Sequence, residues 1–374
     1  MTATRREVLS MAAALGIVAA ACSDDPAADT ATTVEQTVAI EPPPATVAVS
    51  TTVAASTTTT EPATTTTTAG VDPVFPLTGL PVPFGLDPGR PAMVVKLDNH
   101  PIARPQSGLN EADIVFEENV EQLTRFAAVF HSNGTDPVGP IRSGRTQDVD
   151  LLGSFNNPLF VWSGGNRRVA DAIGASGFFQ IDQNVGRGIM FRSERPGPHD
   201  LYADMTKLYL LTPFGSGPPQ QQFSYRAEGD DAAGDPASGV KLSMDGVQAL
   251  WQWDPTTATY GRSSDGKIHQ DTVLDAQFST NNVLVVVVDY VPSPADGRSP
   301  EAQTLGAGEL QVFSAGKHIS GTWTRPDRRS PFVLADPTGI PIPLTPGRTM
   351  IELARAFKWV GIPDGIDPAT VAYP

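Results

Sequence analysis

The chain has 374 residues, of which 40% are hydrophobic and 18% charged, and its formal net charge is −15. This length and apolar content are enough for two folded domains with appendages. The acidic balance argues against a nucleic-acid partner, because phosphate backbones bind basic surfaces. It argues equally against adhesion to anionic lipid through a basic patch.

Residues 1–21 have the features of an export signal. "TRREVL", with Arg5 and Arg6, resembles a twin-arginine signal. The apolar run that follows is too short to remain as a membrane anchor. It ends in "AAAC" at Cys22, the only cysteine of the chain, and this resembles a bacterial lipoprotein cleavage box. We therefore expect a lipid on Cys22 that anchors an extracytoplasmic protein to the cell membrane; the alternative is an ordinary secretory signal with an incidental cysteine.

Residues 22–72 are rich in Thr, Ala and Pro and nearly free of aromatic side chains. Such a segment cannot bury enough apolar surface to offset the entropy of ordering. Proline and β-branched threonine favour extended conformations. The composition predicts a disordered tether that holds a folded part away from a membrane, and its threonines suit O-glycosylation.

Strand-like runs alternate with short helical patterns between residues 73 and 220. We expect strands at 92–100, 112–119, 124–132, 158–166 and 178–182, and helices at 167–175 and 200–211. Only four residues separate the second strand from the third, which fits a hairpin and not a parallel crossover. The pattern predicts a mixed α/β domain with at least one antiparallel hairpin.

The pattern changes after "PFGSGPPQQQ" (213–222), which is rich in helix and strand breakers. From there strand-like runs follow one another, with "VLVVVVDY" (283–290) as the central strand because it is apolar on both faces. We expect a mostly β domain over residues 221–374. The complete fold class is therefore α+β.

Long motifs in both expected domains resemble one family. "VKLDNHPIARPQSGLNEADIVFEENVEQLTRFAAVFHS", "VGPIRSGRTQDVDLL", "SGGN" and "RPGPHDLY" resemble the N-terminal domain of the YerB-like lipoproteins, and "WQWDPTTATYGRSSDGKIHQD", "NNVLVVVV" and "GKHISGTW" resemble their C-terminal domain. The resemblance covers about residues 75–355. It implies an extracytoplasmic lipoprotein associated with cell-wall synthesis, and it implies no known activity. Where the family tends to have glycines in the hairpin turn, this chain has Glu121, Gln122 and Leu123.

Charged and polar residues gather at strand ends and loops of the first domain. Arginine forks bind carboxylates and phosphates through two hydrogen bonds. The alternative is a structural salt-bridge network, but such networks add little stability over an apolar core, so this density of charges favours a binding site. The candidate ligand-binding residues outside the glycine-rich loop are Asp98, Asn99, Arg104, Gln106, Glu117, Glu118, Arg125, Arg142, Arg145, Asp148 and His199.

The loop "GPIRSGRTQD" (139–148) contains two of these arginines. We expect it to cap a helix that begins after Thr146, with Asp148 in the first turn, where acids suit the helix dipole. Its guanidinium groups should point into a cleft lined by Asp98 and the two glutamates. One of Arg142 and Arg145 would neutralise carboxylates, and the other would receive an anionic group such as a peptide carboxylate.

The loop "SGGN" (Ser163, Gly164, Gly165 and Asn166) precedes an expected helix. Backbone N–H groups at a helix N-terminus bind anions, so these residues are further candidates. Glycine pairs at strand-to-helix turns are also common for conformational reasons alone, and this interpretation remains open.

Other chemistries leave little trace in the sequence. It has no Gly-x-Ser-x-Gly motif, its one cysteine lies in the signal, and its five histidines lack metal-ligand spacing. We therefore expect no metal and no cofactor. Two function classes stay open: a binding or scaffold protein for a wall component or wall-synthesis enzyme, and a hydrolase in which Glu117, Glu118 or Asp98 acts as general acid or base.

Aromatic residues stand out in the second domain. Trp251 and Trp253 share one face of a strand, beside Tyr260. An exposed aromatic face suits sugar or protein recognition, whereas a buried one belongs to the core, which is the commoner case. The segment 265–271, which contains His269, has the pattern of a turn without a functional role.

Overall fold

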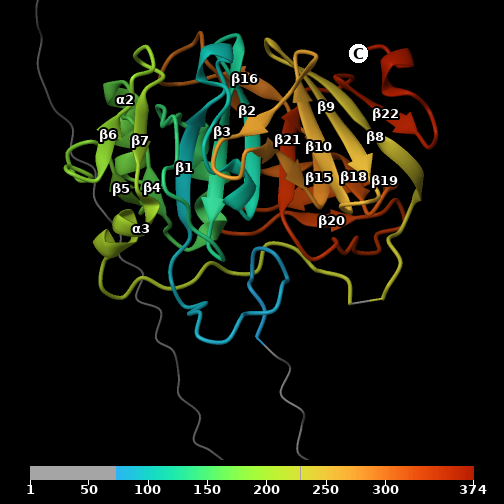
Figure 1. Cartoon of the computed structure of the whole chain (residues 1–374), viewed down its shortest axis with the longest axis horizontal. Helices are drawn as coiled ribbons and strands as arrows, with labels where there is room; N and C mark the ends of the chain where they lie inside the picture. The colour runs from blue at the N-terminus through green and yellow to red at the C-terminus, as the bar shows by residue number, and fades with distance from the viewer. Residues whose placement is uncertain (1–72, 228) are drawn as a thin grey trace, which may run out of the picture. The chain divides into compact units, whose positions relative to one another are not determined.

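The computed structural model of the chain describes residues 73–374 apart from residue 228 (Figure 1). These residues belong to one compact unit. The expected export signal, Cys22 and the Thr-rich tether lie outside the described residues. Within the described part of the chain, no helix is long and apolar enough to span a bilayer.

One mixed sheet of sixteen strands contains strands from both halves of the sequence. Its path runs β11-β10-β9-β8-β19-β18-β15-β21-β2-β3-β1-β4-β5. The N-terminal half contributes five strands to it and has two further strands outside it, which pair with each other. The seven are β1 (Met93–Asp98), β2 (Ile114–Val120), β3 (Leu123–Phe130), β4 (Leu159–Val161), β5 (Phe179–Ile181), β6 (Met190–Arg192) and β7 (Leu201–Ala203).

The hairpin expected in the N-terminal half is β2–β3, whose strands pair antiparallel from Ile114 with Val129 to Val120 with Leu123. Two residues, Glu121 and Gln122, form its turn, and Gln122 takes a left-handed φ of 55° without being glycine. Apart from Leu123, both strands are buried along their whole length. They therefore lie inside the molecule and place their polar residues in the interior.

Helices are few and short, so the N-terminal half is richer in strands than the expected mixed α/β domain. The described α-helices are α1 (Gln147–Leu151), α2 (Arg167–Gly174) and α3 (Met205–Leu208). Five short 3-10 helices accompany them: η1 (Pro101–Ala103), η2 (Leu109–Glu111), η3 (Gly153–Phe155), η4 (Tyr209–Leu211) and η5 (Pro368–Thr370).

The helix expected over residues 200–211 is wrong in its first part. Leu201–Ala203 form β7, which is buried and pairs with β6. The helix begins only after Asp204, because the Asp204 carboxylate accepts the Lys207 amide and so caps α3. The aspartate, and not the apolar periodicity, sets where the helix begins.

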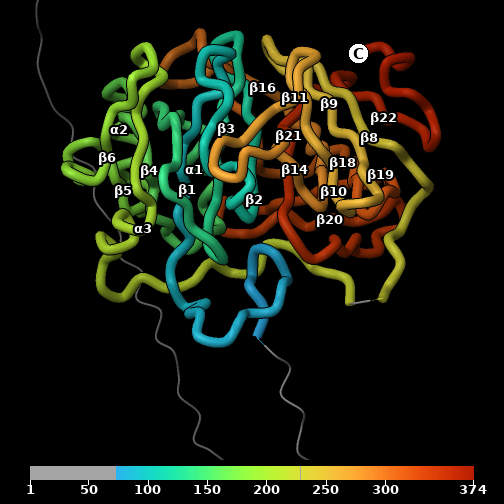
Figure 2. Tube along the Cα trace, in the orientation of Figure 1, coloured from blue at the N-terminus to red at the C-terminus, as the bar shows by residue number. Residues whose placement is uncertain are grey.

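The C-terminal half is mostly β, as expected. Residues 212–227 and 229–234 lie between η4 and the first strand of this half, and Figure 2 draws them. Its strands are β8 (Asp235–Met244), β9 (Val247–Asp254), β10 (Thr259–Ser264), β11 (Lys267–Ile268), β12 (Gln270–Asp271), β13 (Ala276–Gln277), β14 (Ser279–Thr280), β15 (Asn282–Val287), β16 (Tyr290–Pro292), β17 (Pro300–Ala302), β18 (Gly306–Ser314), β19 (Lys317–Arg325), β20 (Val333–Ala335), β21 (Thr349–Ala354) and β22 (Trp359–Pro363).

The two halves join through β21. This strand pairs in parallel with β15 of its own half and with β2 of the N-terminal half, and Figure 1 shows β21 beside β2. All six of its residues are buried. In the pairing with β2, Glu117 lies opposite Glu352. The sheet is thus continuous across the junction.

Both hydrophobic clusters of the described residues also draw on the two halves. One contains Phe126 together with Trp251 and Phe278, whose ring meets that of Phe126 edge-on at 6.3 Å. The other contains Phe116 together with Leu284. The domain boundaries drawn from the sequence stay a prediction, but the halves share their cores.

Cleavage between the halves should therefore not separate them. If a protease site is placed in the linker at residues 214–218, the cut chain should elute from size exclusion as one particle, because parting would expose β21 and β2. Denaturant should be needed to resolve the fragments. Two separately eluting, folded fragments would show that the shared sheet contributes little.

Candidate functional site

Guanidinium groups gather where β1 ends. Asp98 is the last residue of β1 and lies opposite Arg125 of β3. The loop 139–146 runs beside this strand end, where the Arg142 amide donates to the Lys96 carbonyl at 2.8 Å. We call the three guanidinium groups found here the arginine cluster: Arg125, Arg142 and Arg145.

Asp98 binds two partners through one oxygen. Its Oδ2 lies 2.9 Å from Nε of Arg142, as an ion pair, and 2.7 Å from Nδ1 of His199. Its Oδ1 accepts the His100 amide at 2.9 Å. The carboxylate is only 5% exposed, whereas Arg142 is 24% exposed. Asp98 therefore neutralises Arg142 and at the same time fixes the ring of His199.

Arg145 turns away towards the hairpin turn. Its Nη2 donates to both carboxylate oxygens of Glu121, at 2.9 and 2.7 Å. Its backbone amide donates to the Asp148 carboxylate at 2.7 Å, at the start of α1. Glu121 is 40% exposed, so this pair adds little stability. Arg145 therefore has its carboxylate partner in the hairpin turn, away from Asp98.

Arg125 is the exceptional member. It is 8% exposed, and it takes part in none of the ion pairs formed within residues 73–374. The only hydrogen bond of its side chain there runs from Nη1 to the Ser143 carbonyl, at 2.8 Å. Burial, and then the charges of Arg145 and Arg142, lower the pKa of Arg125 to about 9. A buried cation without a carboxylate partner is costly, because desolvation is not repaid by an ion pair.

Two loops cross beside this cation. The Ser163 amide donates to the Arg142 carbonyl at 3.0 Å, and the Gly144 amide to the Gly164 carbonyl at 3.2 Å. The hydroxyls of Ser143 and Ser163 lie 3.4 Å apart. Gly144 permits the crossing, since a Cβ there would come within 2.9 Å of the Trp162 ring. Hydroxyl donors therefore accompany the guanidinium groups.

The residues of the loop "SGGN" have two different roles. Asn166 caps α2, and its side chain accepts the Val169 amide at 3.0 Å. Gly164 takes a φ of 100°, which favours glycine. These two residues serve the turn itself, whereas Ser163 faces Ser143 beside the cluster. Gly165 is exposed between them.

Neither glutamate pairs with an arginine of the loop 139–148, contrary to the expected cleft. Glu118 is fully buried and pairs with Nζ of Lys96, which also binds Asp148 at 2.7 Å. Gln147 donates to the second oxygen of Glu118 at 2.8 Å. Burial lowers the pKa of Lys96 to about 8 although Asp148 opposes the change. Lys96, which the sequence analysis did not single out, therefore neutralises Glu118 and Asp148.

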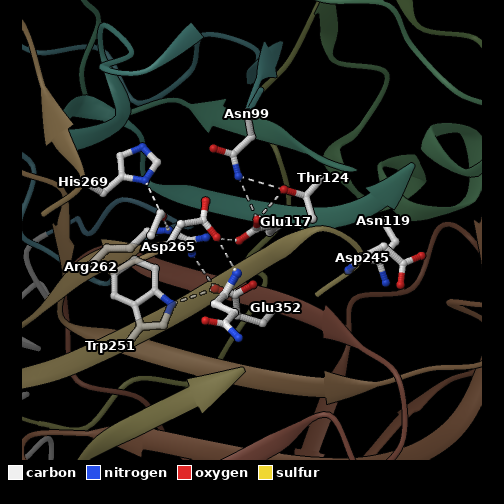
Figure 3. A network of polar contacts seen from close by, with 12 residues as sticks. Asn99, Glu117, Asn119, Thr124, Asp245, Trp251, Arg262, Asp265, His269 and Glu352 are labelled. Atoms are coloured by element: carbon white, nitrogen blue, oxygen red, sulfur yellow. Dashed lines mark hydrogen bonds and ion pairs between the residues drawn. The ribbon is translucent and has the colours of Figure 1, made fainter. Parts of the chain in front are cut away.

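Glu117 points across the junction to Arg262 (Figure 3). The pair is fully buried, with Oε2 of Glu117 2.6 Å from Nη2 of Arg262. Arg262 also binds Glu352 at 2.7 Å, and the Trp251 indole donates to the same Glu352 oxygen at 2.7 Å. Burial and then the charge of Glu117 raise the pKa of Glu352 to about 8. At neutral pH one proton and one arginine therefore balance the two carboxyls.

Asn99, Arg104 and Gln106 connect this junction to the end of β1. Asn99 donates to Glu117 at 2.9 Å, and Arg104 donates to the Asn99 side chain at 2.9 Å. Gln106 donates to the Asp98 carbonyl at 2.8 Å and binds His269 at 2.7 Å. These expected ligand-binding residues instead support the backbone that carries Asp98.

The aromatic residues singled out in the second domain belong largely to the core. Trp251 and Tyr260 are fully buried, and Trp253 is half-buried with its ring 4.9 Å from that of Tyr260. His269, placed in a turn without a role, is buried between Ser264 and Gln106. It is a structural contact between the two halves.

Several residues of these networks carried no signal in the sequence. Lys96 lies within an apolar strand and Arg262 within a polar one, and neither pattern marks its cation as buried. Glu352 follows the apolar pair Met350 and Ile351 on β21. Their partners are distant in the chain. Glu121 was visible only as a departure in the hairpin turn, and His100 as a neighbour of Asp98.

Two family models match the chain. Residues 77–212 match the model described as "Protein of unknown function (DUF3048) N-terminal domain", and residues 240–351 match its C-terminal counterpart. The "Putative lipoprotein YerB" of Bacillus subtilis is 29% identical over 322 residues, which cover 79% of this chain and 88% of that protein. The chain belongs to the YerB-like family.

A solved structure supports the assignment. The crystal structure of YerB from Bacillus subtilis superposes on this YerB-like chain with a TM-score of 0.68 at 25% identity, and it covers 78% of this chain and 99% of that one. The resemblance found in the sequence is confirmed, and so is the division into two family domains. The whole arginine cluster lies in the N-terminal match.

The shared proton of Glu352 should make stability depend on pH. Because its pKa is raised from 4.5 to about 8, the folded state holds a proton that the unfolded chain has released above pH 4.5. This contribution is complete below pH 4.5 and is lost as the pH rises towards 8, with a slope of at most about 1.4 kcal/mol per unit.

Glu352→Gln should remove that slope while keeping the oxygen that accepts from Trp251. The free energy of unfolding, measured in urea from pH 5 to 8, should fall less steeply for the variant than for the wild type. The exposed Glu309→Gln is the matched control and should follow the wild type. Identical slopes for all three proteins would mean that Glu352 is ionised in the folded state.

Proposed function

We propose that this protein is a lipid-anchored extracytoplasmic binding protein whose arginine cluster receives an anionic group of its ligand. The observation that carries the proposal is Arg125, a nine-tenths buried guanidinium without a carboxylate partner among the described residues. Buried charges are ordinarily paired. An anion supplied by a ligand would complete this one.

Charge balance favours a carboxylate over a phosphate. Arg142 is already paired with Asp98, and Arg145 with Glu121. One guanidinium is left uncompensated, which matches a ligand group with a single negative charge. A planar guanidinium fork also fits a carboxylate with two parallel hydrogen bonds.

The burial of the glutamates speaks for binding and against the carboxylate-dependent hydrolase. Glu117 and Glu118 are both fully buried, and each is held by a cation and by further hydrogen bonds. A general acid or base has to reach the substrate directly or through one water. Neither glutamate is open to a substrate in this arrangement.

The sequence and the relative support an extracytoplasmic place of action. The relative named above is called a lipoprotein, and this chain has Cys22 in a lipoprotein-type box before a Thr-rich tether. We infer that a lipid on Cys22 holds the protein at the outer face of the membrane. A wall component or a wall-synthesis enzyme is the partner that this position and the family resemblance favour.

Loss of Arg125 should leave the fold intact. In Arg125→Met, one hydrogen bond disappears, but so do a desolvated charge and its repulsion from two arginines, so the free energy of unfolding should stay within about 1 kcal/mol of wild type. Lys96→Met is the matched control at a buried cation with partners; it strands Glu118 and Asp148 and should cost about 3–5 kcal/mol. Urea unfolding measures both.

An Arg125→Met variant as unstable as Lys96→Met would assign Arg125 to the structure and remove the main support for the binding site. Arg145→Met, at the exposed pair, should unfold like the wild type. Its behaviour separates a general effect of removing charge from the effect of removing the buried cation.

Cys22→Ser should release the protein from the membrane fraction into the medium or wall, because no lipid can be attached. Immunoblots of fractionated cells would measure this, with Ser23→Ala as the neighbouring control that should stay membrane-bound. A Cys22→Ser protein that remains in the membrane fraction would disprove the lipid anchor.

A further inference from the structure

Two histidines beside the arginine cluster have no role in the function proposed above. Nδ1 of His199 lies 2.7 Å from Oδ2 of Asp98. A carboxylate can only accept, so Nδ1 carries the hydrogen, and the neutral form of His199 presents Nε2 as an acceptor. Within the described residues, the His199 side chain forms no other hydrogen bond. Its side chain is 10% exposed, so the ring edge borders solvent.

His100 presents a hydrogen-bond donor where His199 presents an acceptor. Its Nδ1 accepts the Ile102 amide at 3.1 Å, so the ring hydrogen of the neutral form is on Nε2, which becomes a donor. The His100 ring stacks on that of His199, with centroids 4.6 Å apart and an angle of 26° between the planes. An acceptor and a donor therefore lie side by side.

The histidine pair and the arginine cluster form one site, because Arg142 and His199 approach the same Asp98 oxygen. This site offers guanidinium groups for an anion, one nitrogen acceptor and one N–H donor. A bare carboxylate would use only the guanidinium groups. A fully ionised phosphate brings acceptors alone and would leave Nε2 of His199 empty.

The terminal residue of a peptide matches all three functions. Its carboxylate suits Arg125 and Arg142, its amide N–H suits Nε2 of His199, and the carbonyl before it suits Nε2 of His100. We propose that the site binds the free C-terminal residue of a peptide and that His199 reads its amide hydrogen. This inference rests on the proposed anion site and adds the class of ligand.

The test compares small carboxylates on the full chain. Calorimetry or NMR titration would use N-acetylglycine, N-acetylsarcosine, acetate and inorganic phosphate. N-acetylsarcosine differs from N-acetylglycine by an N-methyl group that removes the amide hydrogen. We expect N-acetylglycine to bind about 10-fold more tightly than N-acetylsarcosine, which is the difference that one hydrogen bond of ordinary strength makes. Acetate lacks the carbonyl as well as the amide hydrogen and should bind more weakly than either. Phosphate should bind more weakly than N-acetylglycine.

Variants locate the effect. His199→Phe keeps a ring to stack on His100 and should bind N-acetylglycine and N-acetylsarcosine with equal affinity. His318→Phe is the matched control, since His318 also stacks on an aromatic ring, Phe313, at 4.5 Å. It should keep the 10-fold preference. The comparison of ligands on the wild type decides the matter even if His199→Phe fails to fold.

The outcomes separate this inference from the function beneath it. Equal affinity for acetate, N-acetylglycine and N-acetylsarcosine would overturn the peptide inference and leave the anion site standing. Tighter binding of phosphate would overturn it as well. No binding of any of the four anions would contradict the anion site itself.

Discussion

Arg262, fully buried between Glu117 and Glu352, is the contact on which the rest of the molecule depends. The two carboxyls face each other across the parallel pairing of β2 with β21. Two buried carboxylates would repel each other, and one arginine cannot neutralise both, which is why Glu352 keeps a proton. The β2–β21 pairing requires this balance of charge at its centre.

From this junction, hydrogen bonds lead to the end of β1. Asn99 donates a hydrogen bond to Glu117, and Gln106 donates one to the Asp98 carbonyl. His269 of the C-terminal half in turn binds the side chain of Gln106. Asp98 then positions Arg142 and His199. Rigid support of this kind is what a binding site needs. The β-rich half therefore contributes to the site through the backbone it supports, without adding a side chain to the arginine cluster.

The sequence predicts the part of this architecture that is written in local patterns. The β2–β3 hairpin follows from two strand-like runs with a short gap, and the central β15 from an apolar run. The helix over 200–211 was partly wrong because the Asp204 cap overrides apolar periodicity. The shared sheet could not be predicted, because the pairing of β21 with β2 joins residues more than two hundred positions apart.

The residues of the candidate site could be predicted from the sequence, but their ion pairs could not. Composition and spacing find Asp98, Arg125, Arg142, Arg145 and His199, because polar residues at the ends of buried strands are unusual. They do not show which carboxylate forms an ion pair with which cation. Lys96 pairs with Glu118, and Arg262 pairs with Glu117. Only because these pairs are known is it clear that Arg125 has no carboxylate partner among the described residues. The proposed binding site rests on a missing ion pair, which no local pattern of residues can contain.

The central claim is that Arg125 binds a carboxylate of a ligand. The melting temperature of the protein tests this claim directly. Anions that bind only the folded state raise that temperature further as their concentration rises above Kd. With acetate exchanged for chloride at constant ionic strength, the wild type should melt at increasing temperature and Arg125→Met should not respond. Equal increases in both proteins would show that acetate acts elsewhere and would contradict the account.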